Sequence, residues 1–243
     1  MRWACAMPDS ASVTRAIDVG WLAGRWERAL LRSADGDIDA TSSVTWLQGP
    51  SLFVDLRRPA GGPGTGFAGT LTQANAVFTW RHEIELTPWR GADAGTLEWR
   101  DGHLVERGVH DGYLEHWRPA RPADGQGPVR APGTTVAPCW GLRLAGPSGQ
   151  RAILVRVGDD VGWAQGPAAG VVSFARATGL SSGVITATSS TALLGAQLSW
   201  LDTVDCVLVE TAKADRVAAA RWQVMHREEA HGQPGGVHRG SGD

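Results

Sequence analysis

The chain has 243 residues, enough for one large domain or two small ones with a real core. Its formal charge is -2 at pH 7, with 20% charged and 42% hydrophobic residues, so we expect a globular protein with no electrostatic grip on nucleic acid or on an anionic membrane. No apolar run approaches the roughly 20 residues of a membrane span, and the sequence carries no signal of an oligomeric state.

After a loose lead-in, residues 24–119 read as eight strand-like segments separated by turn residues such as "ADGD", "GP", "AN" and "DG". Strands at this even spacing, with no helical pattern between them, indicate an antiparallel meander. Eight such strands can close into an up-and-down barrel. The segments are "RWERALLRS" (25–33), "DATSSVTWLQ" (39–48), "SLFVDLRR" (51–58), "FAGTLTQ" (67–73), "AVFTWRHEIELT" (76–87), "GTLEWR" (95–100), "HLVERG" (103–108) and "YLEHWRP" (113–119).

The second half of the chain follows a Pro- and Gly-rich stretch at 120–136, which predicts a linker. Strand signals then resume, for example in "APCWGLRLA" (137–145) and "RAILVRVG" (151–158), and predict a second β-rich half over 137–225. Its last segment, "AKADRVAAARWQVM" (212–225), is rich in helix formers and predicts a helix. Residues 226–243 are polar and Gly-rich, which is typical of a disordered tail.

A family resemblance covers roughly residues 18–119. Gly24 and Trp26 of "LAGRWERALL" resemble the G-x-W element of lipocalins and related calycins, in which a first-strand Trp plugs the closed end of an eight-stranded barrel. The pattern "VTWLQGPSLFVDLRRP", "FTWRHEIELTP", "DAGTLEW" and "YLEHW" is also similar to uncharacterised lipocalin-like proteins of bacteria and fungi, some of which resemble tandem barrels of the Hri1 type. The resemblance implies an all-β fold, with a calycin-like barrel over 18–119 and a second or fused barrel behind it.

The segment "SLFVDLRRP" places Phe53, Asp55 and Arg57 on one strand face, opposite an apolar face of leucine and valine. If the apolar face packs outside against the second half, Asp55 and Arg57 point into the barrel lumen. If it points inward, the two charges lie on the surface and pair there, which stabilises little.

His82 lies on a stripe that also holds Phe78, Trp80 and Ile84, with Glu83 and Glu85 on the opposite face. One interpretation is a core histidine held by a hydrogen bond. The other is an acid or base in a pocket, because an imidazole titrates near neutral pH. "HEIE" is not HExxH, so a zinc-protease site is rejected.

The segment "GYLEHWRP" puts Tyr113, Glu115 and Trp117 on one face. A carboxylate between two aromatic rings is partly desolvated, which raises its pKa and suits acid/base work or the binding of a cationic or hydroxylated ligand. The alternative is a rim carboxylate paired with Arg57 or Arg81.

Other chemical motifs are missing from the sequence. It has no Walker-type loop and no GxSxG, its seven histidines do not cluster at metal spacing, and the nitrobindin-type G-x-W-x-G-x-G is absent. We therefore expect no metal and no cofactor. Cys5, Cys139 and Cys206 are far apart and form no CxxC, and the N-terminus lacks the apolar stretch of a secretory signal, which favours a cytoplasmic protein.

These patterns favour a barrel that binds one small, mostly apolar organic molecule. The 12 tryptophans support this, because an indole buries a large surface and keeps one N–H to satisfy. The first hypothesis is a cofactor-free enzyme of the cyclase, isomerase or hydratase/dehydratase (lyase) type. The second is a carrier without chemistry, and the third is an interaction module with a filled barrel. The candidate catalytic residues are Glu115, His82, Tyr113, Arg57 and Asp55, and the candidate ligand-binding residues are Trp46, Phe53, Phe78, Trp80 and Trp117.

Overall fold

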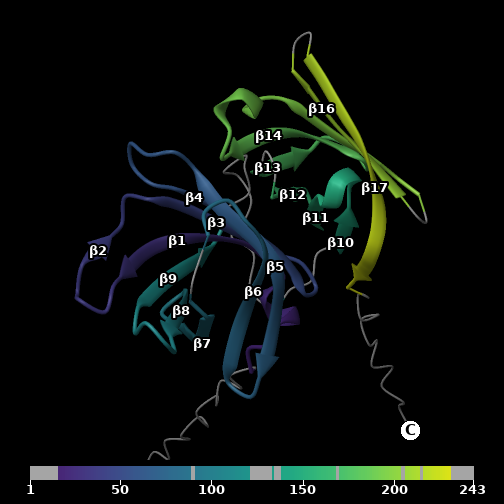
Figure 1. Cartoon of the computed structure of the whole chain (residues 1–243). Coiled ribbons are helices and arrows are strands. Elements are labelled where there is room, and N and C mark those ends of the chain that lie inside the picture. Colours follow the sequence, from purple (N-terminus) through teal and green to yellow (C-terminus); the bar gives the residue numbers. More distant parts are fainter. Residues whose placement is uncertain are drawn as a thin grey trace, which may run out of the picture.

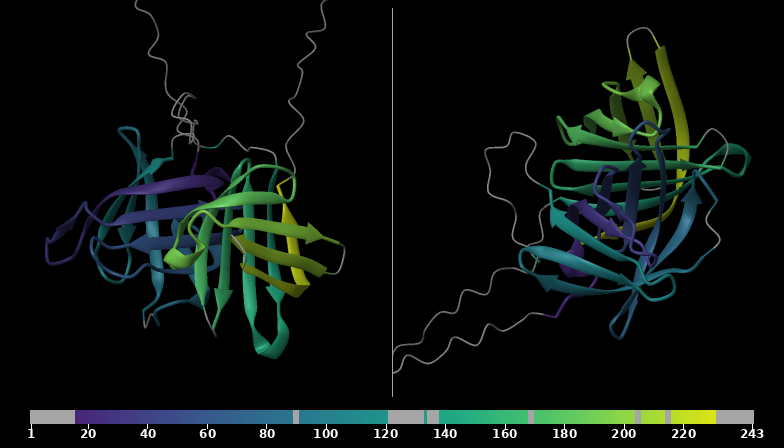
Figure 2. Two further views of the ribbon diagram at one scale, coloured as in Figure 1. Left: turned by 90° about the horizontal axis from the view of Figure 1, so that it is seen from above. Right: turned by 90° about the vertical axis from the view of Figure 1, so that its left-hand side faces the viewer.

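The computed structural model describes residues 16–88, 91–120, 133, 138–167, 170–203, 206–213 and 216–230. It consists of two antiparallel barrels of eight strands each, one in each half of the chain (Figure 1). The two barrels lie side by side (Figure 2). The all-β fold class and the tandem arrangement expected from the sequence are confirmed.

The first barrel is a meander in which each strand pairs with the next, and β1 pairs with β9 to close it. A short 3-10 helix, η1 (Gly20–Leu22), precedes it, and the two-residue strand β2 (Ile38–Asp39) pairs only with the end of β1. The barrel strands are β1 (Gly24–Arg32), β3 (Ser43–Gln48), β4 (Leu52–Arg58), β5 (Thr65–Ala74), β6 (Val77–Glu85), β7 (Asp93–Arg100), β8 (His103–Gly108) and β9 (Leu114–Pro119).

Local turn chemistry explains the short connections of this meander. Asp101 and Gly102 join β7 to β8 with φ angles of 50 and 78°, the left-handed backbone that a two-residue hairpin of this twist requires. Asn75 takes φ 56° at the β5–β6 turn. The turn residues of the sequence predicted these hairpins because Asn, Asp and Gly adopt the positive φ angles that such tight turns require.

The second barrel is also closed, and the helix expected at 212–225 is wrong. Residues 206–213 and 216–229 form a hairpin whose second strand also pairs with β10 and completes the barrel. Pairing along both edges of this strand outweighs the helix propensity of its alanines. The elements are β10 (Cys139–Ala145), η2 (Pro147–Gly149), β11 (Arg151–Val157), β12 (Asp160–Gly166), β13 (Val171–Ala177), β14 (Ser182–Thr188), η3 (Thr191–Leu193), β15 (Gln197–Asp202), β16 (Cys206–Lys213) and β17 (Arg216–Glu229).

The structure also bears on the expected segment boundaries. Strand β17 runs to Glu229, so the part of the expected tail from 226 to 229 belongs to the second barrel. Residues 231–243 lie outside the described residues. So does the expected linker at 120–136, apart from Ala120 and Gly133.

The apolar outer face of β4 forms the contact between the barrels. Leu52, Val54 and Leu56 are 0–1% exposed and belong to a core cluster that includes Ile153 and Val155 of β11. A Cβ on Gly162 of β12 would lie 3.0 Å from Val54, so the two sheets approach closely there. Because this face is covered by the second barrel, the alternate residues of β4 point into the first barrel.

Polar contacts reinforce this apolar contact. Arg143 on β10 donates from Nε and Nη2 to both carboxylate oxygens of Glu83 on β6, at 2.6 and 2.7 Å, and from Nη2 to Thr70 on β5 at 2.8 Å. Glu228 on β17 accepts from the backbone N–H groups of Ser51 and Leu52 at 2.9 and 2.7 Å. The barrels are thus joined by directional bonds as well as by apolar burial.

Candidate functional site

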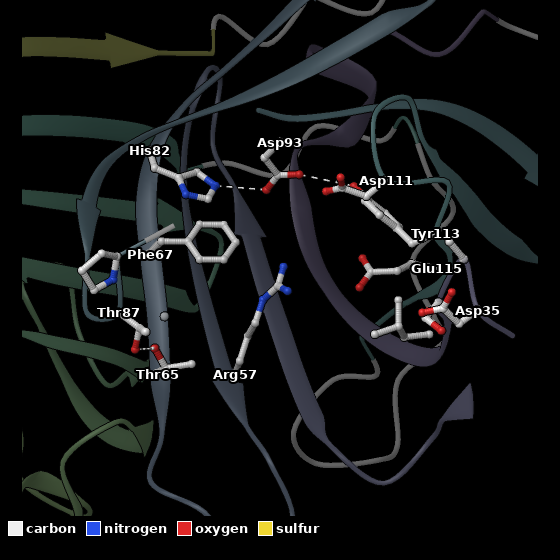
Figure 3. A pocket seen from close by; sticks show the side chains of 15 residues that line it. Asp35, Arg57, Thr65, Phe67, His82, Thr87, Asp93, Asp111, Tyr113 and Glu115 are labelled. Carbon is white, nitrogen blue, oxygen red and sulfur yellow. Dashed lines mark hydrogen bonds and ion pairs between the residues drawn. The ribbon is translucent and has the colours of Figure 1, made fainter. Parts of the chain in front are cut away.

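A cavity of about 550 Å³ lies at one end of the first barrel (Figure 3). Eleven of its described lining residues are polar or ionisable, or are aromatic side chains in contact with them, and they converge from β4, β5, β6, β7, β9 and the neighbouring loops. Those labelled in Figure 3 are Asp35, Arg57, Thr65, Phe67, His82, Thr87, Asp93, Asp111, Tyr113 and Glu115. A small inner pocket adjoins the cavity and shares Arg57, Phe67, Asp93 and Glu115 with it.

Tryptophans fill the barrel beyond the inner pocket. Trp26 stacks on Trp21 and on Trp46, with ring centroids 6.0 Å apart in each case, and its Nε1 donates to the carbonyl of Leu22 at 2.7 Å. Trp99 meets Trp26 edge-on. The tryptophan of the G-x-W element is therefore part of an aromatic plug, and the cavity lies at the opposite, polar end of the lumen.

Asp55 and Arg57 on β4 are brought together inside the barrel. Arg57 donates from Nε to Asp55 Oδ1 at 2.9 Å, and Asp55 is 3% exposed. Burial raises the pKa of Asp55 to about 6, although Arg57 opposes the rise. Burial works against the charge of Arg57 too, but the nearby carboxylates of Asp55, Glu115 and Asp93 raise its pKa above the usual value. Arg57 therefore stays a cation, and Asp55 titrates near neutral pH.

Phe67 on β5 connects two of the ionisable groups. Its ring stacks on the imidazole of His82, with centroids 4.0 Å apart and planes at 20°, and the guanidinium of Arg57 lies 4.7 Å from its centroid. Such stacking fixes the guanidinium of Arg57, on β4, and the imidazole of His82, on β6, relative to the ring of Phe67 on the strand between them. In Figure 3, the Arg57 side chain extends towards the centre of the cavity beside this ring.

A β-bulge sets the position of His82. Ala68 pairs with Ile84 and Gly69 with His82, so Glu83 is an inserted residue on β6. The bulge needs Gly69, because a Cβ there would lie 1.8 Å from the carbonyl oxygen of Arg81. It reverses the alternation of side chains beyond His82, and the sequence-based assignment of faces is therefore wrong for the residues that follow.

Two residues change place as a result. Ile84, expected beside His82, instead packs in the core between the barrels. Glu85, expected on the opposite face, lies 2.8 Å from His82 Nδ1.

A chain of hydrogen bonds runs across the cavity wall from His82. Its Nε2 is 3.0 Å from Asp93 Oδ2, and the hydroxyl of Tyr113 donates to Asp93 Oδ1 at 3.3 Å (Figure 3). The same hydroxyl lies 2.6 Å from Glu106 Oε1. Glu85 lies at the other ring nitrogen of His82. The chain of contacts therefore runs from the half-buried carboxylate of Glu85, through His82, Asp93 and Tyr113 at the cavity surface, to the deeply buried carboxylate of Glu106.

Glu106 forms the buried end of this chain. It is 3% exposed, and its Oε2 accepts from Trp117 Nε1 at 3.0 Å. Burial, reinforced by the charges of Glu115 and Asp93, raises its pKa well above 4.5. Burial, with Glu106 and Asp93, also raises the pKa of Tyr113 far above its usual value of 10. Both shifts favour the uncharged forms, a carboxylic acid beside a phenol.

Glu115 has a different partner from either one expected. Arg28 on β1 donates from Nη1 to Glu115 at 2.8 Å and from Nη2 to Asp39 at 2.7 Å. The side chains of Arg28 and Glu115 are each 5% exposed, so this is a buried ion pair and not a rim contact with Arg57 or Arg81. It fixes Glu115 in the wall that faces Arg57.

The structure places the expected ligand-binding aromatics in the core. All five are 7% exposed or less. Trp46, Trp80 and Trp117 border the small inner pocket, whereas Phe53 and Phe78 border neither it nor the larger cavity. Phe67 takes the aromatic position beside the cavity that the sequence assigned to these residues.

Several residues of the site were missed in the sequence, among them Arg28, Phe67, Asp93 and Glu106. Two of them had a visible signal. Arg28 lies two positions after Trp26, and Glu106 two positions after Leu104, so each charged residue shares a strand face with a core residue. Asp93 was hidden in a segment interpreted as a turn, and Phe67 at the start of a strand next to a glycine-rich loop.

The structure adds two findings about absences. In the described ranges, no group of three or more His, Cys, Asp or Glu side chains is placed to hold a metal ion. Nor does any helix among those residues have the length and apolar character of a membrane span.

Comparison with known proteins bears on the fold. No protein-family model matches the chain, and no curated protein matches it. Among solved structures, the uncharacterized protein YLR301w from baker's yeast (Saccharomyces cerevisiae) is similar over 85% of this chain and 99% of its own, with 13% identity and a TM-score of 0.57. This similarity spans both barrels and confirms the tandem-barrel resemblance at the level of the fold.

Two other solved structures were also found. A lipocalin-like protein from Bacteroides uniformis matches over 41% of this chain and 99% of its own, with 20% identity and a TM-score of 0.34. A protein of unknown function from the DUF3598 family, from Nostoc punctiforme, matches over 88% of this chain and 100% of its own, with 12% identity and a TM-score of 0.26.

Proposed function

We propose that the first barrel binds a small organic molecule in its polar end and acts on it by acid/base chemistry without a cofactor, as an isomerase, cyclase or hydratase/dehydratase does. The observation that carries this proposal is the convergence of Arg57, His82, Asp93, Tyr113 and Glu115 on one cavity. Ionisable groups gathered in a cleft, with perturbed pKa values among them and beside them, are typical of catalytic sites.

The proposed roles follow from the charge states of the groups. Arg57 stays a cation and Tyr113 a neutral phenol, so both can donate hydrogen bonds to a substrate oxygen. Asp93 or Glu115 accepts a proton from the substrate. The contacts of His82 with Asp93 and Glu85 then give that proton a route towards solvent.

The lining also favours one kind of ligand. Four carboxylates, from Asp35, Asp93, Asp111 and Glu115, face the cavity against one arginine and one histidine. We therefore propose a molecule with an apolar body, packed on Phe67, and a hydroxyl or amine group at the acidic wall. This revises the mostly apolar ligand expected from the sequence.

A carrier without chemistry is the second candidate. The observation in its favour is that Arg28 pairs with Glu115, Arg57 pairs with Asp55 and His82 contacts Asp93, so these groups already have partners without a substrate. The cavity volume argues against a barrel filled throughout, and the apolar face of β4 is covered by the second barrel. The cytoplasm stays the proposed compartment, on the cysteine pattern of the sequence.

The experiment incubates the protein in deuterium oxide with aromatic ketones, alcohols, amines and carboxylic acids. Ligand-observed NMR measures binding, and mass spectrometry measures deuterium uptake at carbon. Tyr113→Phe and Glu115→Gln are compared with wild type. Glu98→Gln is the matched control, because Glu98 is about half exposed and pairs with Arg100 on the outer surface.

Each outcome has a defined meaning. Binding in all four proteins, with deuterium uptake lost only in Tyr113→Phe or Glu115→Gln, supports the enzyme. Binding that the site variants weaken, with no uptake in any protein, supports the carrier. Binding that Tyr113→Phe and Glu115→Gln leave unchanged, with no deuterium uptake in any of the four proteins, contradicts both proposals.

A further inference from the structure

The second barrel contains a cavity of its own, of about 220 Å³. Its wall includes Trp163 and Trp222, whose rings meet edge to face with centroids 5.4 Å apart. None of the described residues that line it is charged; its polar members are glutamine, serine and threonine. It differs in this from the acidic cavity of the first barrel, so the two would select different ligands.

One polar group in this wall has no partner. The indole Nε1 of Trp222 is buried and makes no hydrogen bond within the described part of the chain, and Trp222 as a whole is 1% exposed. By contrast, the indole N–H groups of Trp26, Trp46 and Trp117 in the first barrel donate to oxygen atoms at 2.7, 3.2 and 3.0 Å. A buried donor left without an acceptor costs about 1–3 kcal/mol, so this one stands out.

One side of the Trp222 indole is held against the backbone of a neighbouring strand end. A Cβ on Gly146 would lie 2.6 and 2.8 Å from Cζ3 and Cε3, so the six-membered ring is packed against that glycine. The edge that carries Nε1 is on the opposite side of the indole. The ring of Trp163 is a weak acceptor at best, so the N–H still requires an oxygen or nitrogen lone pair.

We propose that the second barrel holds a separate binding site for a small neutral molecule with an apolar body and one hydrogen-bond acceptor, such as a ketone or ester, and that Trp222 Nε1 donates to this acceptor. The uncharged lining excludes ions, because a charge moved there from water would find no counter-charge. Ala218 and Ala219 in the lining are exposed, so the site has access to solvent near the start of β17. This site is independent of the function proposed for the first barrel.

Two isosteric probes test the assignment: acetophenone, which carries a carbonyl oxygen, and α-methylstyrene, which has a CH2 group in its place. ¹H–¹⁵N NMR of the indole N–H groups follows each titration on the full chain. The Trp222 signal is assigned by its loss in Trp222→Phe. We expect acetophenone to move this signal downfield with saturation, and α-methylstyrene to bind about tenfold more weakly.

Three variants keep the test independent of folding. Trp222→Phe should bind the two probes equally. Ala220→Leu, which places a larger side chain in the cavity wall, should abolish binding while Trp222 keeps its signal. Tyr113→Phe, in the first barrel, should leave the Trp222 response unchanged.

Three results would overturn the proposal. One is a Trp222 signal that responds to neither probe, which would mean that the cavity holds only water. Another is an equal response to both probes in wild type. The third is saturation that persists in Ala220→Leu.

Discussion

Arg28 and Glu115 form an ion pair of 2.8 Å in which both side chains are about 5% exposed, and this pair ties β1 to β9 where the first barrel closes. Its position means that one contact serves two purposes. It seals the strands that complete the barrel, and it holds a carboxylate in the wall of the cavity. Loss of the pair should therefore affect stability as well as binding.

Arg28→Leu should destabilise the protein by about 3–5 kcal/mol, because it leaves Glu115 buried without its counter-charge. Chemical denaturation at neutral pH measures the free energy of unfolding. Arg100→Leu is the control, since Arg100 pairs with Glu98 in water and that pair is worth less than about 1 kcal/mol. Equal losses in the two variants would contradict the buried pair.

Asp55 should make stability fall as pH rises from about 4 to about 6. Folding raises the pKa of this group from 3.8 to about 6, so the folded state holds the proton more tightly than the unfolded chain in this window. Such a rise corresponds to about 3 kcal/mol, and Asp55→Asn should not lose it. Chemical denaturation at pH 4 and pH 7 gives the change in the free energy of unfolding for wild type and for Asp55→Asn. The difference between the two changes reports Asp55, because Glu106 is present in both proteins and contributes equally. Equal changes in the two proteins would refute this.

Glu83 should show the opposite dependence. Burial raises its pKa, but the hydrogen bonds from Arg143 and Thr70 outweigh burial and lower the pKa below 4.5. The contribution of the Glu83–Arg143 pair is therefore complete above pH 4.5 and is lost as pH falls through the lowered pKa. A double-mutant cycle with Glu83→Gln and Arg143→Met should give a coupling of about 1 kcal/mol at pH 7. A coupling that does not weaken as the pH is lowered stepwise below 4.5 would count against this contact between the barrels.

Gly69→Ala should disrupt the bulge that positions His82. Its Cβ would lie 1.8 Å from a backbone oxygen, which cannot move without breaking the β5–β6 ladder. We expect a loss above about 3 kcal/mol and a changed environment for His82, seen in the NMR signals of its ring. Gly179→Ala is the control, because its Cβ would meet only the side-chain oxygen of Ser182, at 3.3 Å. A stable Gly69→Ala protein with an unshifted His82 would disprove the role of this glycine.

The regular parts of the fold could be predicted from the sequence because they depend on local rules. Alternating side chains and turn residues located the strands of the first barrel, including the hairpin at Asp101 and Gly102. The strand over 216–229 could not be found in this way. Its alanines favour a helix in isolation, and only the two neighbouring strands hold it extended.

The sequence pointed to only some of the residues that the structure gathers at the candidate cavity, because the other placements depend on contacts between distant parts of the chain. Which face of β4 holds Asp55 depends on the second barrel covering the other face, and no local pattern contains that information. The contact of His82 with Glu85 depends on a single inserted residue, which reverses the alternation. Arg28 reaches Glu115 only through the closure of the barrel, across 87 positions of the chain.

The shared wall at β4 has a consequence for attempts to divide the protein. Leu52, Val54 and Leu56 face the second barrel, while Asp55 and Arg57 face the small inner pocket of the first. Expression of the first half alone, divided from the second within 120–136, would leave the apolar face of β4 uncovered. An exposed apolar face of this kind promotes aggregation. We therefore expect the two halves to fold properly only when expressed together, and a change in the second barrel that disturbs this contact can shift the residues of β4 that line the first.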